Sequence, residues 1–228
     1  MITSGSLIHY DIGAGAEAFS TTRDASLPYP VIQAHQTHSD RVALITDPNT
    51  TRADLEGVDA LITRLPRCAI GARTADCIPV LLYDPEQQAI AAIHAGWRGT
   101  VLHIVCRTIE QMRRHFRTDP AQLKAIIGPG IGFAGFQVGA EVVEAFRDAG
   151  FPMQQIWEDQ GAKQPGSMTG GHHIDLWEAN RWLLTESGVL PGHIQMAGLC
   201  TYGHPELFYS ARREGTACPR LIHAIRLL

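Results

Sequence analysis

Residues 73–100 constrain the fold more than any other part of this sequence. They contain two apolar runs, 80–83 and 89–93, which are separated by an Asp-Pro turn signal. Two such runs are expected to pair as a hairpin, in which the start of one strand lies beside the end of the other. This pairing brings Cys77 next to His94, although they are distant in sequence. The geometry predicts a functional site at that end of the hairpin.

The composition is that of an ordinary globular protein. The chain has 228 residues, of which 45% are hydrophobic and 18% charged, so it can bury a sizeable core. We expect a single domain over residues 1–228. The net charge of −4 gives no electrostatic reason to expect nucleic acid as a partner.

The expected compartment is the cytoplasm. No apolar run approaches the roughly 20 residues needed to cross a bilayer, which argues against a membrane partner. The first residues lack the basic and apolar segments of a signal peptide. The five cysteines are scattered and odd in number, which favours a reducing environment over a disulfide framework.

The rest of the chain alternates short apolar runs with helical patterns, which predicts an α+β fold with mixed sheets. Helices are expected at 100–117 with Thr100 as N-cap, at 141–148, and after Asp175, which has Glu178 three residues on. The polar, glycine-rich segment 152–171 is expected to be a loop. Further strands are expected at 18–22, 42–45, 60–63, 69–72, 123–127, 194–199 and 221–225.

Two histidines and a cysteine are the residue types of an open zinc site. Cys77, His94 and a histidine of the polar tract 35–40 would leave a fourth position for water, as in catalytic zinc sites. Both His35 and His38 belong to this tract, and the local sequence does not decide between them. A Cys–His nucleophilic pair without metal would use two of the same residues.

Several motifs resemble those of the YfiH-like multicopper polyphenol oxidase (laccase-domain) family. They occur in the family's order from about residue 18 to the C-terminus: HQTHSDRV, GVDALIT, TADCIPVLLYDP, AAIHAGWRGT, IGPGIG, FQVGAEV and SARREG. The resemblance implies an α+β sandwich of mixed sheets flanked by helices, similar to cytotoxic necrotising factor catalytic domains. It also implies His38, Cys77 and His94 as the metal ligands, and so selects His38 over His35.

The activity that the resemblance implies is zinc-dependent processing of purine nucleosides. Adenosine, inosine, guanosine or methylthioadenosine would react with phosphate, and adenosine could also be deaminated. Copper-dependent oxidation of polyphenols and amidase editing of a muramoyl-serine precursor of peptidoglycan are the alternatives within the family. A binding protein without activity is a further alternative. Many relatives carry cysteines in the glycine-rich loop where Gly130 and either Ala134 or Gly135 stand here, which weakens the multicopper interpretation.

Further site residues are expected from their positions near these ligands. The three ligand residues are also expected to be catalytic, and Asp76, beside Cys77, is expected to orient a ligand or accept a proton. Arg73 and Arg98 are expected to bind phosphate, because guanidinium groups suit phosphate oxygens. Gln36 is expected to contact the substrate.

Overall fold

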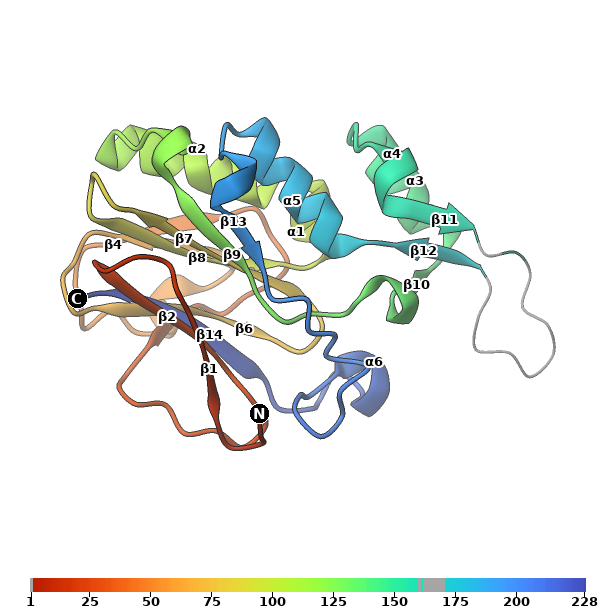
Figure 1. The fold of residues 1–228 in the computed structure, drawn as a ribbon, viewed down its shortest axis with the longest axis horizontal. Helices are drawn as coiled ribbons and strands as arrows, with labels where there is room; N and C mark the ends of the chain where they lie inside the picture. The colour runs from red at the N-terminus through yellow and green to blue at the C-terminus, as the bar shows by residue number, and fades with distance from the viewer. Residues whose placement is uncertain (1, 160, 162–170) are drawn as a thin grey trace.

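Two mixed sheets pack face to face, and helices cover the outer face of the larger sheet (Figure 1). The computed structural model describes residues 2–159, 161 and 171–228. The five-stranded sheet has the order β1 (Leu7–Tyr10), β2 (Ala16–Thr21), β14 (Leu221–Leu227), β6 (Ala69–Thr74) and β3 (Ile32–Gln33). The six-stranded sheet has the order β13 (Ile194–Met196), β9 (Lys124–Ile127), β7 (Ile78–Asp84), β8 (Ala89–Ala95), β5 (Ala60–Thr63) and β4 (Val42–Ile45). The expected α+β fold with mixed sheets is confirmed.

The antiparallel hairpin β7–β8 lies in the middle of the six-stranded sheet. Pro79 pairs with His94, so the predicted hairpin is confirmed and the residue just before β7 lies beside the end of β8. Every residue of both strands is buried. Along β7, Val80 belongs to the core beneath the helices, whereas Leu81 belongs to the core between the sheets. Burial on both faces explains why these strands are apolar without alternation.

The helix after the hairpin is interrupted, which corrects the prediction that Thr100 caps one continuous helix. α1 (Trp97–Val101) begins after Gly96, and α2 (Ile104–Phe116) follows only after His103, whose φ is 59°. That left-handed conformation ends the first helix. Thr100 is buried inside α1, and its hydroxyl accepts a hydrogen bond from the Asn180 side chain in α5 (Leu176–Glu186).

A three-stranded sheet lies at one end of the molecule, beside α3 (Ala140–Asp148) and α4 (Met153–Ile156) (Figure 1). Its order is β10 (Gln137–Val138), β12 (His172–Ile174) and β11 (Trp157–Asp159). The prediction of a loop over 152–171 is therefore wrong for residues 153–159, and residues 160 and 162–170 lie outside the described residues. The predicted cap is confirmed, because the Asp175 carboxylate accepts a hydrogen bond from the Glu178 amide at 3.0 Å.

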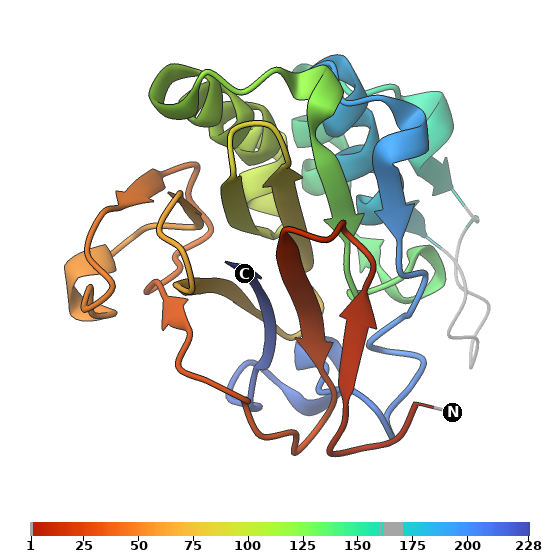
Figure 2. The same ribbon diagram turned by 60° about the vertical axis from the view of Figure 1, so that its left-hand side comes forward.

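Short helical turns complete the fold: η1 (Ala53–Leu55), η2 (Pro120–Gln122), η3 (Phe133–Gly135), η4 (Pro191–His193) and α6 (Ala211–Glu214). In the turned view of Figure 2, the longer helices also lie on one side of the sheets. None of the helices in the described part of the chain is long and apolar enough to span a membrane.

Candidate metal centre

Three side chains from separate segments converge at the end of the β7–β8 hairpin. His38 lies in the loop between β3 and β4, Cys77 directly precedes β7, and His94 is near the end of β8. Their ligand atoms all lie within 4.8 Å of one another. The Cys77 Sγ is 3.7 Å from Nε2 of His38, and the two imidazole centroids are 5.0 Å apart. The structure thus brings together the three residues that the sequence motifs indicate.

Two of the supporting backbone positions have left-handed φ values, which are uncommon for residues other than glycine. His38 has a φ of 64°, and Asp76, which precedes Cys77, has a φ of 94°. The Asp76 carbonyl accepts a hydrogen bond from the Ile131 amide at 2.8 Å. Both residues lie in bends of the chain, at His38 itself and directly before Cys77.

Asp59 connects two of the three ligand residues. Its carboxylate accepts a hydrogen bond from Nδ1 of His94 at 2.7 Å, which leaves Nε2 of that ring for the common centre. The same carboxylate accepts the backbone amides of Thr37, His38 and Ser39, at 3.0, 2.9 and 2.8 Å. One buried acid therefore sets the orientation of His94 and the course of the loop that carries His38.

The electrostatics of the centre favour a thiolate. Burial raises the pKa of Cys77, but the imidazoles of His94 and His38 outweigh burial and lower that pKa to about 6. Burial lowers the pKa of His94, but Cys77 and Asp59 outweigh it and raise that pKa. In the same way, burial raises the pKa of Asp59, yet hydrogen bonds from His94 and the Ser39 amide lower it to about 2. In the metal-free centre these pKa shifts favour a Cys77 thiolate beside a protonated His94, so a metal ion that binds there would displace the proton from Nε2 of His94.

The donor set fits a metal ion. Two imidazole nitrogens and one thiolate are ligands that Zn²⁺ binds in open catalytic sites, and thiolate and imidazole also suit copper. Gly96 leaves the room that this convergence needs. A Cβ at that position would lie 2.8 Å from Cδ2 of His38 and 2.9 Å from Sγ of Cys77. The glycine is required by the close approach of two ligands and not by its backbone conformation.

The centre opens into a cavity of about 610 Å³. Its wall includes the three ligand residues, and among the described residues that line it none is acidic. The remaining lining residues come from the strands and loops around the centre: Ala34, His35, Gln36, Arg52, Arg73, Thr74, Ala75, Ala211, Thr216, Ala217, Cys218, Pro219 and Arg220. The cavity is large enough for a small organic substrate.

The other predicted site residues have specific places around this cavity. Arg73 and Gln36 both line it, and the Gln36 side-chain amide pairs with the Arg73 backbone through two hydrogen bonds of 2.8 Å. Arg98 is exposed and its guanidinium stacks on the Trp97 ring, 4.3 Å from the ring centroid, outside the cavity lining. His35 lines the cavity, and its ring is paired with the Glu56 carboxylate instead of facing the ligands.

Asp76 lies beside Cys77 in sequence, but its carboxylate binds the C-terminal segment. One oxygen accepts a hydrogen bond from the Thr201 hydroxyl at 2.6 Å. The other accepts the Ser210 hydroxyl at 3.0 Å and the Arg212 amide at 2.7 Å. These contacts fix the start of α6 against the turn that presents the thiol.

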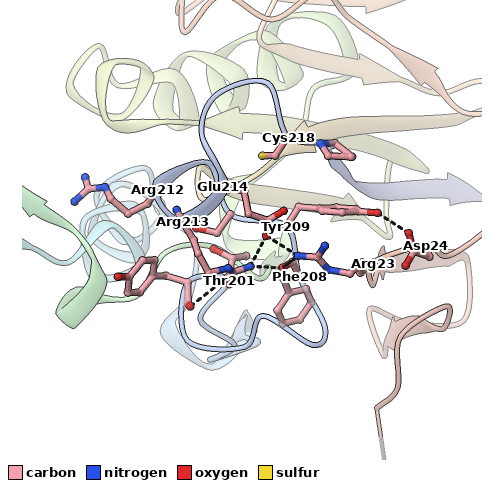
Figure 3. A network of polar contacts seen from close by, with 12 residues as sticks. Arg23, Asp24, Thr201, Phe208, Tyr209, Arg212, Arg213, Glu214 and Cys218 are labelled. Atoms are coloured by element: carbon pink, nitrogen blue, oxygen red, sulfur yellow. Dashed lines mark hydrogen bonds and ion pairs between the residues drawn. The ribbon is translucent and has the colours of Figure 1, made fainter.

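A network of ionic contacts holds the same C-terminal segment against the N-terminal part of the chain (Figure 3). The Glu214 carboxylate accepts hydrogen bonds from Arg23 at 2.5 Å and from Arg213 at 2.7 Å. Arg213 also donates to the carbonyl groups of Thr201 and Phe208. The segment that follows α6 lines the cavity, so this network fixes one of its walls.

These features together define a two-sheet α+β protein with an open His₂Cys metal-binding centre. The family described as multi-copper polyphenol oxidoreductase laccase matches residues 16–228, and the chain belongs to this family. The family resemblance of the sequence motifs is therefore confirmed.

Curated relatives point to an enzyme. A "Purine nucleoside phosphorylase" of Bacteroides thetaiotaomicron is 44% identical over 209 residues, which cover 89% of this chain and 75% of the relative. "Adenosine deaminase RL5", from an unknown prokaryotic organism, is 42% identical over 191 residues, covering 81% of this chain and 70% of the relative. The prediction that the chain is an enzyme of this kind is confirmed.

Solved structures support the fold. The "hypothetical protein YfiH" of Bacillus licheniformis superposes with a TM-score of 0.82 at 26% identity, covering 93% of each chain. YlmD from Geobacillus stearothermophilus superposes with a TM-score of 0.78 at 24% identity, covering 96% of this chain and 94% of that one.

Proposed function

We propose that this protein is a zinc-dependent purine nucleoside phosphorylase that also deaminates adenosine. The observation that carries the proposal is the convergence of His38, Cys77 and His94 at the wall of a cavity that contains no acidic side chain among the described residues. The names of the relatives supply the substrate class, because they include phosphorylases and an adenosine deaminase. Purine nucleoside and phosphate are the two substrates of the first reaction.

The two reactions make different demands on the site. Phosphorolysis breaks the bond between C1′ of the ribose and N9 of the purine, forms a bond from C1′ to a phosphate oxygen, and leaves a proton on the purine. Deamination adds water at C6 of adenosine and expels ammonia, which gives inosine. Both need a polarising group and a route for protons inside a cavity that excludes bulk water.

The ligand residues would hold the metal through Nε2 of His38, Sγ of Cys77 and Nε2 of His94. Zinc in such an open site supplies Lewis-acid chemistry and lowers the pKa of water that reaches it. Asp59 keeps the proton of His94 on Nδ1, so that the other nitrogen remains a ligand. Asp76 is assigned a positioning role, because its oxygens already accept hydrogen bonds from the C-terminal segment.

The proposal is tested with purified, zinc-loaded protein incubated with adenosine in the presence and absence of phosphate. Adenine and ribose 1-phosphate are expected only with phosphate, and inosine is expected in both cases. The variant Cys77→Ala should lose bound zinc and both products. Cys106→Ala, which removes a partly buried thiol on α2, is the matched control. A zinc-loaded protein that forms none of these products would refute the proposed activity.

The same protein preparation distinguishes the zinc hypothesis from the copper hypothesis. The zinc assignment predicts that the copper-loaded protein does not consume dioxygen with a phenol, whereas zinc restores nucleoside turnover to the metal-free protein. Dioxygen consumption at the turnover rate of the nucleoside reaction would favour the oxidase instead.

A further inference from the structure

Three arginines from separate segments line the cavity that contains the metal centre. Arg52 precedes η1, Arg73 is on β6, and Arg220 directly precedes β14. β6 and β14 are paired, with Thr74 opposite Leu221, so the second and third arginines lie at the same end of two neighbouring strands. The fold thus gathers three positive charges that are far apart in sequence.

No carboxylate balances these charges. Within the described residues, none of the three guanidinium groups forms an ion pair, and the cavity lining contains no acidic side chain. Arg220 donates to the backbone carbonyls of Cys218 and Thr216, which positions it without neutralising it. Paired arginines elsewhere in the chain, such as Arg23 with Glu214, show the contrasting arrangement.

Each arginine is held in place by its surroundings. The side-chain amide of Gln36 fixes the backbone of Arg73 on both its N–H and its carbonyl. The loop that carries Arg52 is tied to the strand segment at His35, because the His35 amide donates to Leu55 and the His35 carbonyl accepts from Gly57. The fold therefore fixes the backbone positions from which Arg52 and Arg73 reach the cavity.

The like charges oppose one another. Burial lowers the pKa of Arg73, and the neighbouring charges of Arg52 and Arg220 lower it further. A protein gains stability when an anion relieves such repulsion, and guanidinium forks match the oxygens of a tetrahedral phosphate. The three metal ligands and the three arginines line the same cavity, so one substrate-sized space adjoins both groups.

We propose that Arg52, Arg73 and Arg220 form a binding subsite for inorganic phosphate, separate from the metal ligands. The inference rests on the proposed function, in which phosphate is the second substrate. A phosphate held there offers an oxygen to C1′ of the nucleoside while the C1′–N9 bond breaks and its electron pair leaves with the purine. The subsite requires no oxidant, reductant or further co-reactant.

Phosphate binding is measured by calorimetry, independently of turnover. The alanine variants of Arg52, Arg73 and Arg220 should each weaken phosphate binding by at least about tenfold, because a charged hydrogen-bond donor is lost. Arg73→Lys should bind phosphate better than Arg73→Ala, since it keeps the charge but not the fork. Arg114→Ala, on the exposed face of α2, is the matched control and should leave binding unchanged.

Repeating the titration with Cys77→Ala distinguishes phosphate bound by the arginines from phosphate bound by the metal. The subsite predicts that this metal-deficient variant still binds phosphate, and that adding Arg73→Ala weakens this binding by at least about tenfold. Unchanged phosphate affinity in all three alanine variants, or loss of all phosphate binding in Cys77→Ala alone, would overturn the inference. Circular dichroism and thermal unfolding identify any variant that fails to fold, and Arg73→Lys then supplies the result for that position.

Two further outcomes separate this inference from the proposed function. Phosphate binding that depends on the arginines, without any nucleoside turnover, refutes the activity but supports the subsite. Phosphorolysis in which the KM for phosphate is unchanged in the arginine variants refutes the subsite but supports the activity. Adenosine monophosphate carries the same phosphoryl dianion, so arginine-dependent binding of this nucleotide at least about tenfold tighter than phosphate would replace inorganic phosphate as the ligand.

Discussion

The Asp59 carboxylate lies 2.7 Å from Nδ1 of His94 and also accepts three successive backbone amides from the loop that carries His38. A single buried acid therefore supports two ligands that are 56 residues apart in sequence. Outer-sphere carboxylates of this kind fix the tautomer and direction of a ligating imidazole. The geometry of the metal centre therefore depends on Asp59 as well as on the ligands themselves.

Replacing Asp59 by Asn should weaken zinc binding by roughly 10- to 100-fold, because the amide no longer orients His94 as strongly. The affinity is measured by competition with a chromophoric chelator. Asp148→Asn, at the exposed end of α3, is the control. An Asp59→Asn protein that folds and binds zinc as tightly as the wild type would contradict the assigned role.

Gly96→Ala should also weaken zinc binding, for a steric reason. The added methyl group would overlap His38 and Cys77, and both contacts would be shorter than 3.0 Å. The backbone at Gly96 is not left-handed, so strain of the main chain does not contribute. Gly192→Ala, where a Cβ meets nothing within 4 Å, should leave zinc content unchanged. Equal zinc content in the two variants would show that the close approach is not needed.

Asp76→Ala should destabilise the protein by about 2–4 kcal/mol, because it leaves the buried hydroxyl groups of Thr201 and Ser210 and the partly buried amide of Arg212 without an acceptor. Asp76→Asn keeps one acceptor and a side chain that tolerates left-handed φ, so it should recover part of this loss. Urea unfolding gives the free energies. The pH profile of kcat should be the same in Asp76→Asn as in the wild type. Loss of one limb of that profile would assign Asp76 to proton transfer.

His223 should make the protein less stable in acid. Its ring is buried between the hydroxyl groups of Ser20 and Thr74, and burial, with a smaller effect of the His94 charge, lowers its pKa to about 3. Because the folded pKa lies below the unfolded value of about 6.5, its contribution is fully present above pH 6.5 and is lost as the pH falls toward 3. Between pH 7.5 and pH 5 this loss is about 2 kcal/mol.

The measurement for His223 is urea unfolding of metal-free protein at both pH values, with His223→Gln as the comparison. The glutamine variant cannot be protonated, so it should lose about 2 kcal/mol less than the wild type over this range. The comparison cancels the titration of groups common to both proteins. Identical pH dependence in the two proteins would show that the buried ring is not the source.

The hairpin and two of the metal ligands could be predicted from local sequence, because a turn between two apolar runs fixes which residues meet. His38 needed the family motifs, since the loop that carries it reaches the centre only through tertiary contacts. Asp59 was missed, although one signal was present: it is an acid between the apolar residues Val58 and Ala60. A charge in an apolar run has to find a partner when it is buried.

Other features were not predictable from local patterns. The interruption at His103 contains neither glycine nor proline, so no breaker signal marks it. The local sequences around Arg52 and Arg220 do not show that both side chains line the same cavity as Arg73. Arg220 is placed there by the pairing of β6 with β14, and Arg52 by the path of the η1 loop. Charge clusters of this kind become visible only when distant segments have been placed.

The complete burial of β7 and β8 affects how a bound metal ion would dissociate from the centre. Amides in strands that are shielded on both faces exchange with solvent only when the whole structure opens. His94 is part of that slowly opening unit and Cys77 adjoins it, whereas the exposed imidazole of His38 belongs to a loop. Dissociation of a bound ion by local motion would therefore begin at His38, and its residence time would depend on how firmly Asp59 holds the loop that carries His38.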